Sequence, residues 1–291
     1  MNLYRLQILA LFMVPLLVLA GALALGRVIP VPVLGRAYVV QVPLPEPGAE
    51  IDLPEVLGPP DSTRPLVVID PGHGGHDPGA SGAGQTEKTL VLALARALRD
   101  RLLEEGGIRV AMTRSDDRFL ALTERVEVTR RLNADLFVSI HADSAGERQE
   151  VSGASIYTLS DVASSEAAAR FAARENQADV INGVDISGGD DAVNAILVEL
   201  SQRRASQAST EFAGLIVREG GEALDFHEQP LRSAALAVLR APDVPSVLFE
   251  SGYITNEAEA ARLSSAKGQQ AFAEALARAI RVFFARASVA G

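Results

Sequence analysis

The chain has 291 residues, a net charge of -10 and no cysteine. Its length leaves room for one or two domains with a full hydrophobic core. The acidic balance argues against a broad nucleic-acid-binding surface, which needs a basic patch, and the absence of cysteine excludes disulfides, zinc fingers and thiol nucleophiles.

The N-terminal segment predicts export from the cytoplasm. The run from Leu6 to Leu25 carries no charge, and Arg27 follows it. This run is long enough for one membrane-spanning helix, and it also fits a secretory signal with small residues at Ala20–Ala22. Residues 1–27 are therefore expected to be a cleaved signal peptide or a retained membrane anchor. The proline-rich stretch 28–64 predicts an extended linker.

Residues 65–288 alternate between buried strand-like runs and amphipathic helices. Strands are expected at Leu66–Ile69, Ile108–Thr113, Leu136–Ile140, Ala154–Leu159, Ala234–Leu239 and Ser246–Phe249. Helices are expected at Thr86–Glu105, Leu120–Leu132 and Gln269–Arg286. This alternation predicts an α/β domain with a mostly parallel central sheet flanked by helices.

The alternation breaks between residues 161 and 223. This part of the chain contains two helix-like stretches, 163–181 and 191–221, joined by a flexible glycine-rich segment, and no convincing strand. We therefore expect residues 161–223 to form a helical block inserted into the α/β domain.

Three of the expected strands end in residues that can carry chemistry. His73, His141 and Glu250 follow three different strands, and Glu87 opens the first helix. Functional groups gather beyond the carboxyl ends of strands in open α/β sheets, so these four side chains are expected to converge. Two imidazoles and a carboxylate suit a catalytic zinc ion, with His73, Glu87 and His141 as ligands. Glu250 is then the general base.

Each residue also has a structural interpretation. A glycine-rich turn after a strand is often a phosphate-binding loop, but residues 70–79 lack both the Walker lysine spacing and a GxGxxG pattern. Glu87 at a helix start could simply interact favourably with the helix dipole. His141 could be a hydrogen-bonded histidine of the core, and Glu250 could be the partner in a buried salt bridge. A surface turn is favoured for His76, a structural ion pair or cap for Arg125 and Asp143, and the role of His227 stays open.

Several ordered blocks resemble one family. They are IDPGHGGHDPGA at 69–80, TEK at 86–88, LTERVEVTRRLNADLFVSIHAD at 122–143, GASIYTLS at 153–160 and APDVPSVLFESGYITN at 241–256. The chain resembles the zinc-dependent N-acetylmuramoyl-L-alanine amidases of the third amidase type, in particular the cell-division amidases of Gram-negative bacteria. The resemblance implies hydrolysis of the amide between N-acetylmuramic acid and L-alanine in peptidoglycan. It also carries the ligand roles over to His73, Glu87 and His141 and the catalytic role to Glu250.

The resemblance further implies a periplasmic, autoinhibited enzyme that an activator with a LytM-type domain releases. A carboxylate in the open position of the metal would block the site, and the first helix of the expected insert offers Glu166 and Glu175. We expect Glu166 to be this plug because it lies nearer the preceding strand, with Glu175 as the second choice. The second helix of the insert would dock the activator, and the inner membrane would be a partner if the N-terminus is uncleaved. The chain is expected to be a monomer.

Two other functions are compatible with the sequence. A noncatalytic peptidoglycan-binding module could have kept the fold, although the presence of all four site residues argues against it. A different zinc hydrolase of the cell wall, a peptidase or a deacetylase, is not excluded by the ligand spacing.

Overall fold

The computed structural model describes residues 13, 14, 17, 52–146, 148, 150–181, 184–185, 195–221 and 223–290. The chain divides into two compact units, Met1–Glu50 and Ile51–Gly291, and the second unit is described below. The expected signal or anchor over 1–27 lies almost entirely outside the described residues. Within the described part, no helix is both long and apolar enough to span a bilayer.

The second unit contains a central sheet, helices on both of its faces and two small hairpins. The strands are β1 (Leu66–Pro71), β2 (Ser81–Gly82), β3 (Gln85–Thr86), β4 (Arg109–Met112), β5 (Leu136–Asp143), β6 (Ala154–Leu159), β7 (Val180–Ile181), β8 (Val184–Asp185), β9 (Phe226–Ala234) and β10 (Ser246–Tyr253). The helices are α2 (Glu87–Glu105), α3 (Leu122–Arg131), α4 (Glu166–Glu175), α5 (Ala195–Gly220), α6 (Glu257–Ser264) and α7 (Ala266–Ala290), with 3₁₀ turns η1 (Asn176–Asp179) and η2 (Ala237–Leu239).

The six strands of the main sheet run in the order β4-β1-β5-β10-β6-β9. All neighbouring pairs are parallel except β10 and β6, which are antiparallel. The inner strands β1, β5 and β10 are buried on both faces, which explains why their sequences are continuous apolar runs. The predicted α/β fold with a mostly parallel sheet is confirmed.

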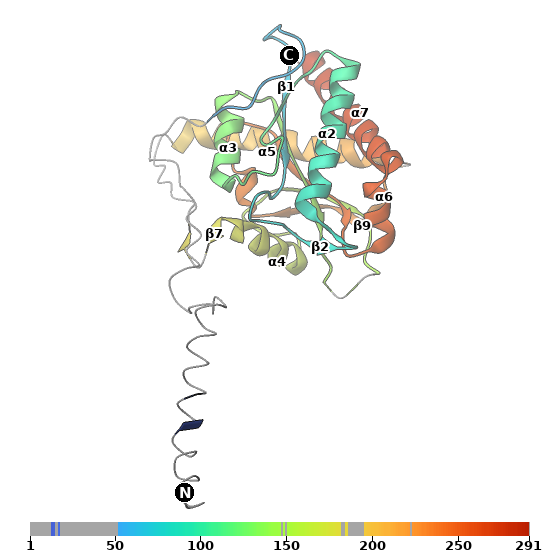
Figure 1. Cartoon of the computed structure of the whole chain (residues 1–291). Helices are drawn as coiled ribbons and strands as arrows, with labels where there is room; N and C mark the ends of the chain where they lie inside the picture. Colours follow the sequence, from blue (N-terminus) through green and yellow to red (C-terminus); the bar gives the residue numbers. More distant parts are fainter. Residues whose placement is uncertain are drawn as a thin grey trace, which may run out of the picture. The chain divides into compact units, whose positions relative to one another are not determined.

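Each face of the sheet has its own core. One core joins Val67 and Ile69 of β1 to residues of α2, α5 and α7 such as Leu94, Ile216 and Leu276. The other joins Val68 of β1 to Tyr157 of β6 and Phe171 of α4. Figure 1 shows α2 and α7 side by side, and α4 apart from them, near β7. This second face, covered by α3 and α4, also carries the predicted site.

The helices of the block at 161–223 pack on opposite faces of the sheet. Phe212, Leu215 and Ile216 of α5 are buried in the core that α5 shares with α7, whereas Phe171 of α4 is buried on the opposite face. The apolar positions of α5 within 212–216 therefore stabilise the domain itself. The short strands β7 and β8 also lie within the block.

One predicted strand is wrong. The run Ala234–Leu239 was expected to be a strand, but β9 ends at Ala234 and residues Ala237–Leu239 form η2. These apolar residues fill the core under α3 without adding to the sheet. The actual strand β9 is a half-exposed edge strand rich in polar residues, so hydrophobicity did not reveal it.

The end of the expected linker belongs to the domain. Leu57 pairs antiparallel with Val110 on the outer edge of β4, through backbone N–O distances of 2.8 and 2.9 Å. This pairing covers part of an exposed sheet edge, which would otherwise invite association with other chains. The compact unit therefore begins before the predicted boundary at residue 65.

Candidate metal centre

The four side chains expected to converge lie on adjacent elements. His73 follows β1, His141 lies in β5 and Glu250 lies in β10, and these three strands are neighbours in the sheet. Glu250 and His141 are direct partners in the register of β10 and β5. Glu87 is the first residue of α2. All four are buried, so the predicted convergence is observed at the carboxyl ends of the strands.

Glu87 lies between the two histidines. Its Oε1 is 3.1 Å from Nε2 of His73 and 3.1 Å from Nδ1 of His141. The backbone N–H of Ala142 donates to the same oxygen at 2.9 Å, and the N–H of Ala80 donates to Oε2 at 2.8 Å. Burial alone would raise the pKa of Glu87, but the two histidines outweigh it and hold the pKa well below its usual range. The carboxylate is therefore fixed in its charged form.

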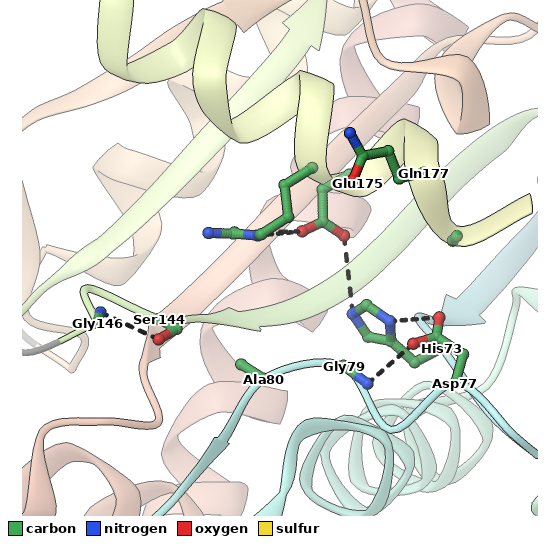
Figure 2. A pocket seen from close by; sticks show the side chains of 10 residues that line it. His73, Asp77, Gly79, Ala80, Ser144, Gly146, Glu175 and Gln177 are labelled. Atoms are coloured by element: carbon green, nitrogen blue, oxygen red, sulfur yellow. Dashed lines mark hydrogen bonds and ion pairs between the residues drawn. The ribbon is translucent and has the colours of Figure 1, made fainter. Parts of the chain in front are cut away.

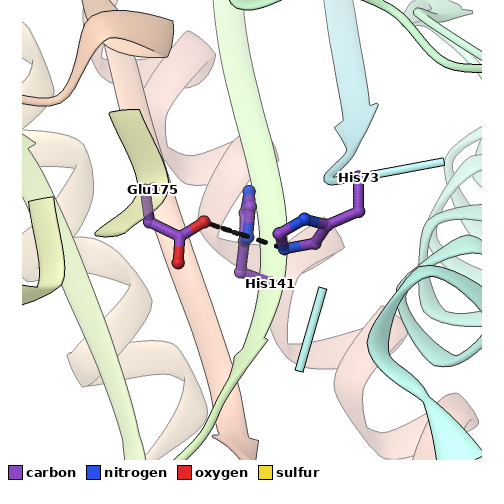
Figure 3. A group of neighbouring side chains, drawn as sticks. All are labelled: His73, His141 and Glu175. Carbon is purple, nitrogen blue, oxygen red and sulfur yellow. Dashed lines mark ion pairs between the residues drawn. The ribbon is translucent and has the colours of Figure 1, made fainter. Parts of the chain in front are cut away.

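Glu175, the last residue of α4, also lies next to both histidines. Its Oε2 lies 3.7 Å from Nε2 of His73 and 3.4 Å from Nδ1 of His141 (Figure 3). A tetrahedral zinc ion with bonds of about 2.0–2.2 Å needs ligand atoms roughly 3.3–3.6 Å apart. The four distances from the two histidines to Glu87 and Glu175 run from 3.1 to 3.7 Å; only that between His141 and Glu175, 3.4 Å, lies within this range, and the others lie close to it.

The imidazole of His73 is held in an orientation that suits a metal ligand. Its Nδ1 lies 2.8 Å from a carboxylate oxygen of Asp77, and its Nε2 faces Glu175 (Figure 2). The same Nε2 also faces Glu87. That Nε2 is buried and makes no well-directed hydrogen bond within the described residues, although Oε1 of Glu87 lies 3.1 Å away. A carboxylate on one ring nitrogen commonly fixes a histidine whose other nitrogen binds a metal. The donor set, with this nitrogen facing two carboxylates, therefore fits a zinc ion.

The electrostatics of this group also favour a cation. Burial alone would lower the pKa of His73, but the carboxylates of Glu87, Asp77 and Glu175 outweigh it and hold the pKa well above its usual range. A metal ion competes with a proton for the same nitrogen and satisfies the same carboxylates.

Two positions near the site must be glycine because neighbouring side chains lie too close to the backbone for a Cβ atom. A Cβ on Gly72 would lie 2.3 Å from ring atoms of His141, so the bare backbone packs directly against that imidazole. Gly79 has φ of 63°, and a Cβ there would lie 2.6 Å from Oε2 of Glu87 and from the ring of His73. The glycine-rich loop therefore brings its backbone within van der Waals contact of the ligand side chains.

Two buried arginines hold the loop that carries His73. Arg125 donates to the carbonyls of Pro71 and His73 and pairs with Asp70 at 2.6 Å. Arg114 donates to the carbonyls of Pro71 and Gly72. His73 itself has φ of 59°, a left-handed conformation that costs free energy for a residue other than glycine. The predicted structural ion pair of Arg125 is observed, and its role is to fix the loop in this conformation.

Glu250 is buried beside His141, its register partner on the neighbouring strand β5. Neither of its carboxylate oxygens has a hydrogen-bond partner within the described residues. Burial raises the pKa of Glu250 well above its usual range, and the charges of Asp143, Glu87 and Glu175 add to the effect. A buried carboxyl with a raised pKa suits a residue that takes up and releases a proton.

The preference for Glu166 as the plug is not supported by its position. Glu166 is 84% exposed in its side chain and forms an ion pair with Arg170, one turn further along α4. Glu175, the second choice, is the residue that lies at the two histidines. Glu166 was expected because it lies nearer the preceding strand, but α4 begins at Glu166 and approaches the histidines with its other end.

The remaining candidates have structural positions. His76 is an exposed residue whose ring lies 4.1 Å from that of Phe119, which agrees with a surface turn. His227 lies on β9, where its Nδ1 accepts from the N–H of Gln229. Asp143 pairs with Arg174 of α4 at 2.6 Å, so its interpretation as an ion-pair partner is confirmed.

Some residues of the site were missed from the sequence. Asp77 stands four residues after His73 in the same loop, and Arg174 precedes Glu175. Together with Ser144 and Gln177, these residues line an open cleft of about 470 Å³ beside His73. A carboxylate spaced to reach the first histidine was a usable signal for Asp77, whereas nothing in the sequence pointed to Arg174.

Comparison with known proteins agrees with this geometry. A family model described as N-acetylmuramoyl-L-alanine amidase matches residues 67–282. The chain is 40% identical over 225 residues to the amidase AmiC of Escherichia coli (strain CFT073), which covers 76% of this chain and 54% of that protein. It is 38% identical over 221 residues to AmiA of Escherichia coli K12, which covers 75% of this chain and 76% of that protein.

A solved structure shares the fold. The amidase AmiC2 of Nostoc punctiforme matches with a TM-score of 0.55 and 30% identity, over 77% of this chain and 98% of that one. The chain spans about half the length of the Escherichia coli AmiC protein that it matches. The extent of the family match and the identity to these relatives show that the chain belongs to the N-acetylmuramoyl-L-alanine amidase family.

Proposed function

We propose that this protein is a zinc-dependent N-acetylmuramoyl-L-alanine amidase. It would hydrolyse the amide between the lactyl group of N-acetylmuramic acid and the L-alanine of the peptide stem, in cell-wall remodelling and daughter-cell separation. The observation that carries the proposal is the convergence of His73, Glu87 and His141 on one point beside Glu250. The family match supports the choice of substrate.

The chain's own residues divide the work of hydrolysis. His73, Glu87 and His141 would hold the zinc ion, and Asp77 would fix the His73 ring. When bound, the ion would supply Lewis-acid activation of the attacking water and of the amide carbonyl. Glu250 takes the proton from that water and returns it to the leaving nitrogen.

The same geometry supports an autoinhibited ground state. Glu175 occupies the side of the group that a substrate or water would need. The neighbouring Arg174 donates to Asp143 of β5 at 2.6 Å, which ties the end of α4 to the strand that carries His141. Glu175 would thus cover the metal position, and the ion pair of Arg174 with Asp143 would hold it there.

Two further contacts hold α4 in place. The Phe171 ring stacks on Tyr157 of β6 with centroids 4.4 Å apart. The amide of Asn176 donates to the carbonyl of Ala235 at 2.8 Å and accepts from the N–H of Ala237 at 2.8 Å. These contacts join α4 and η1 to β6 and to the segment after β9, so a partner that displaced α4 would have to break them to open the site.

We infer that this partner is an activator protein with a LytM-type domain and that the protein works in the periplasm. The uncharged N-terminal segment supports export, either as a cleaved signal or as an anchor in the inner membrane. The protein is expected to act on peptidoglycan as a monomer.

A cell-wall peptidase or deacetylase is the competing enzyme class, because the same ligands could serve either reaction. A noncatalytic binding module is disfavoured, since a protein that only bound peptidoglycan would have no use for the buried, unpaired carboxylate of Glu250.

Metal content is the first experimental test. The purified protein should contain about one zinc ion per chain, and a chelator should abolish release of stem peptides from purified sacculi until zinc is restored. Persistence of cleavage in fully metal-free protein would refute the proposed mechanism.

A further inference from the structure

Ser155 lies in the same row of the sheet as the two central residues of the site. In the strand register, His141 of β5 pairs with Glu250 of β10, and Glu250 pairs with Ser155 of β6. Direct partners on neighbouring strands point to the same face of a sheet. In an antiparallel pair such as Glu250 and Ser155, the two Cβ atoms lie roughly 4.5–5.5 Å apart. The side chains of Ser155 and Glu250 are therefore neighbours on one face of the sheet.

The hydroxyl of Ser155 is buried and unpaired. Ser155 is 2% exposed, and its Oγ has no hydrogen-bond partner among the described residues. Other buried hydroxyls on these strands are paired: Ser139 donates to Asp70, Ser246 to the carbonyl of Val244 and Ser251 to the carbonyl of His141. The hydroxyl of Ser155 thus lacks a partner that its neighbours have.

The unpaired atoms gather at the site. Within the part of the chain that the structure describes, the buried side-chain polar atoms without a partner are Ser155 Oγ, both oxygens of Glu250, His73 Nε2 and Arg118 Nε. Apart from Arg118 Nε, these atoms belong to Ser155, to Glu250 or to the proposed metal ligand His73. Leaving a buried polar atom unpaired costs stability, and such atoms in native proteins call for a functional explanation.

We propose that Ser155 is a substrate-positioning residue that hydrogen-bonds the nitrogen of the scissile amide. This inference rests on the proposed amidase function and adds the residue that orients the leaving group. The amide N–H donates to Ser155 Oγ, which holds the nitrogen against Glu250. Water then attacks the carbonyl carbon, a C–O bond forms and the C–N bond breaks. The proton that Glu250 took from the water passes to the nitrogen, and Ser155 neither gains nor loses a proton.

Ser155→Ala tests the inference in the full-length, zinc-loaded protein. Loss of one neutral hydrogen bond to the reacting group should lower kcat about 10-fold, with a smaller change in KM. Zinc content should stay at the parent level. The melting temperature should stay the same or rise, because the variant removes an unpaired buried hydroxyl. Ser155→Thr keeps the oxygen and should restore most of the lost turnover.

Ser246→Ala is the matched control. It removes a buried hydroxyl from β10, the strand of Glu250, but that hydroxyl is paired and belongs to the first residue of the strand, four positions before Glu250. This variant should lower the melting temperature and leave kcat unchanged. A fully active Ser155→Ala, or one that loses zinc or melts earlier while kcat holds, would overturn the role of Ser155 alone. A zinc-loaded parent that never cleaves the amide, even when opened by Glu175→Ala, would overturn the proposed function and this inference with it.

Discussion

Glu175 Oε2 lies 3.4 Å from Nδ1 of His141, although the two residues come from a helix and a strand on different layers. The contact brings a second buried carboxylate next to Glu87. Burial raises the pKa of Glu175, and the charge of Glu87 adds to the effect, whereas His141 and His73 lower it. Two carboxylates in such a site are stable together only with cationic charge between them. The proposed metal ion, held by His73, Glu87 and His141 and covered by Glu175, would add to this charge.

Glu175→Ala should therefore raise activator-free cleavage of sacculi, because it removes the carboxylate that covers the metal. We expect an increase of at least about 10-fold, which corresponds to a closed state favoured by about 1.4 kcal/mol or more. Glu166→Ala is the matched control, since Glu166 lies on the same helix but is exposed and paired with Arg170. Equal activity of both variants and the parent, at equal zinc content, would remove the support for autoinhibition by α4.

Glu250→Gln should separate chemistry from metal binding. The amide keeps the shape of the carboxyl group but cannot accept a proton, so turnover should fall by about 10²–10⁴-fold. Zinc content, measured by atomic emission on the same preparation, should stay near one per chain. His73→Ala and His141→Ala should lose both the metal and the activity. Loss of zinc from Glu250→Gln would instead make Glu250 a ligand.

The buried pair of Asp70 and Arg125 should make stability depend on acid pH. Burial alone would raise the pKa of Asp70, but Arg125, Thr113 and Ser139 outweigh it and hold the pKa below the ordinary value of 3.8. A carboxyl whose pKa is lowered by folding contributes stability above its unfolded pKa and loses it as the pH falls through the folded pKa. The contribution should therefore be complete above pH 3.8 and decline below it.

Urea unfolding of the parent and of Asp70→Asn between pH 3 and 6 would test this pair. At pH 6 the variant should be less stable by about 3–5 kcal/mol, because it takes the carboxylate away from a buried arginine. The difference in the free energy of unfolding should shrink as the pH falls below 3.8. A difference that is the same at every pH would show that the charge of Asp70 does not matter.

The site could be predicted from the sequence because its residues stand where strands end. His73, His141 and Glu250 each follow or extend a continuous apolar run, and such runs identify inner parallel strands. Three adjacent strands then bring these residues to one edge without any knowledge of the helices. The apolar runs that precede these residues were thus enough to predict that they lie close together in the fold.

The errors arose where tertiary packing decides. The edge strand β9 is polar on its exposed side, whereas the apolar run that follows Ala234 turns into the core as η2. The choice between Glu166 and Glu175 depended on which end of α4 meets the sheet, and both residues lie on the same short helix. Residue spacing alone does not contain the direction in which a helix approaches a site.

The identity of the cleaved bond tests the account most directly. Purified sacculi digested by the zinc-loaded Glu175→Ala variant should release stem peptides that begin with a free L-alanine amine and leave glycan strands with intact, peptide-free muramic acid. Mass spectrometry of the soluble products, with Glu250→Gln as the inactive control, would detect both. Release of peptides cut within the stem or at cross-links, or of acetate from intact glycan, would contradict the assignment of this site to amide hydrolysis at N-acetylmuramic acid.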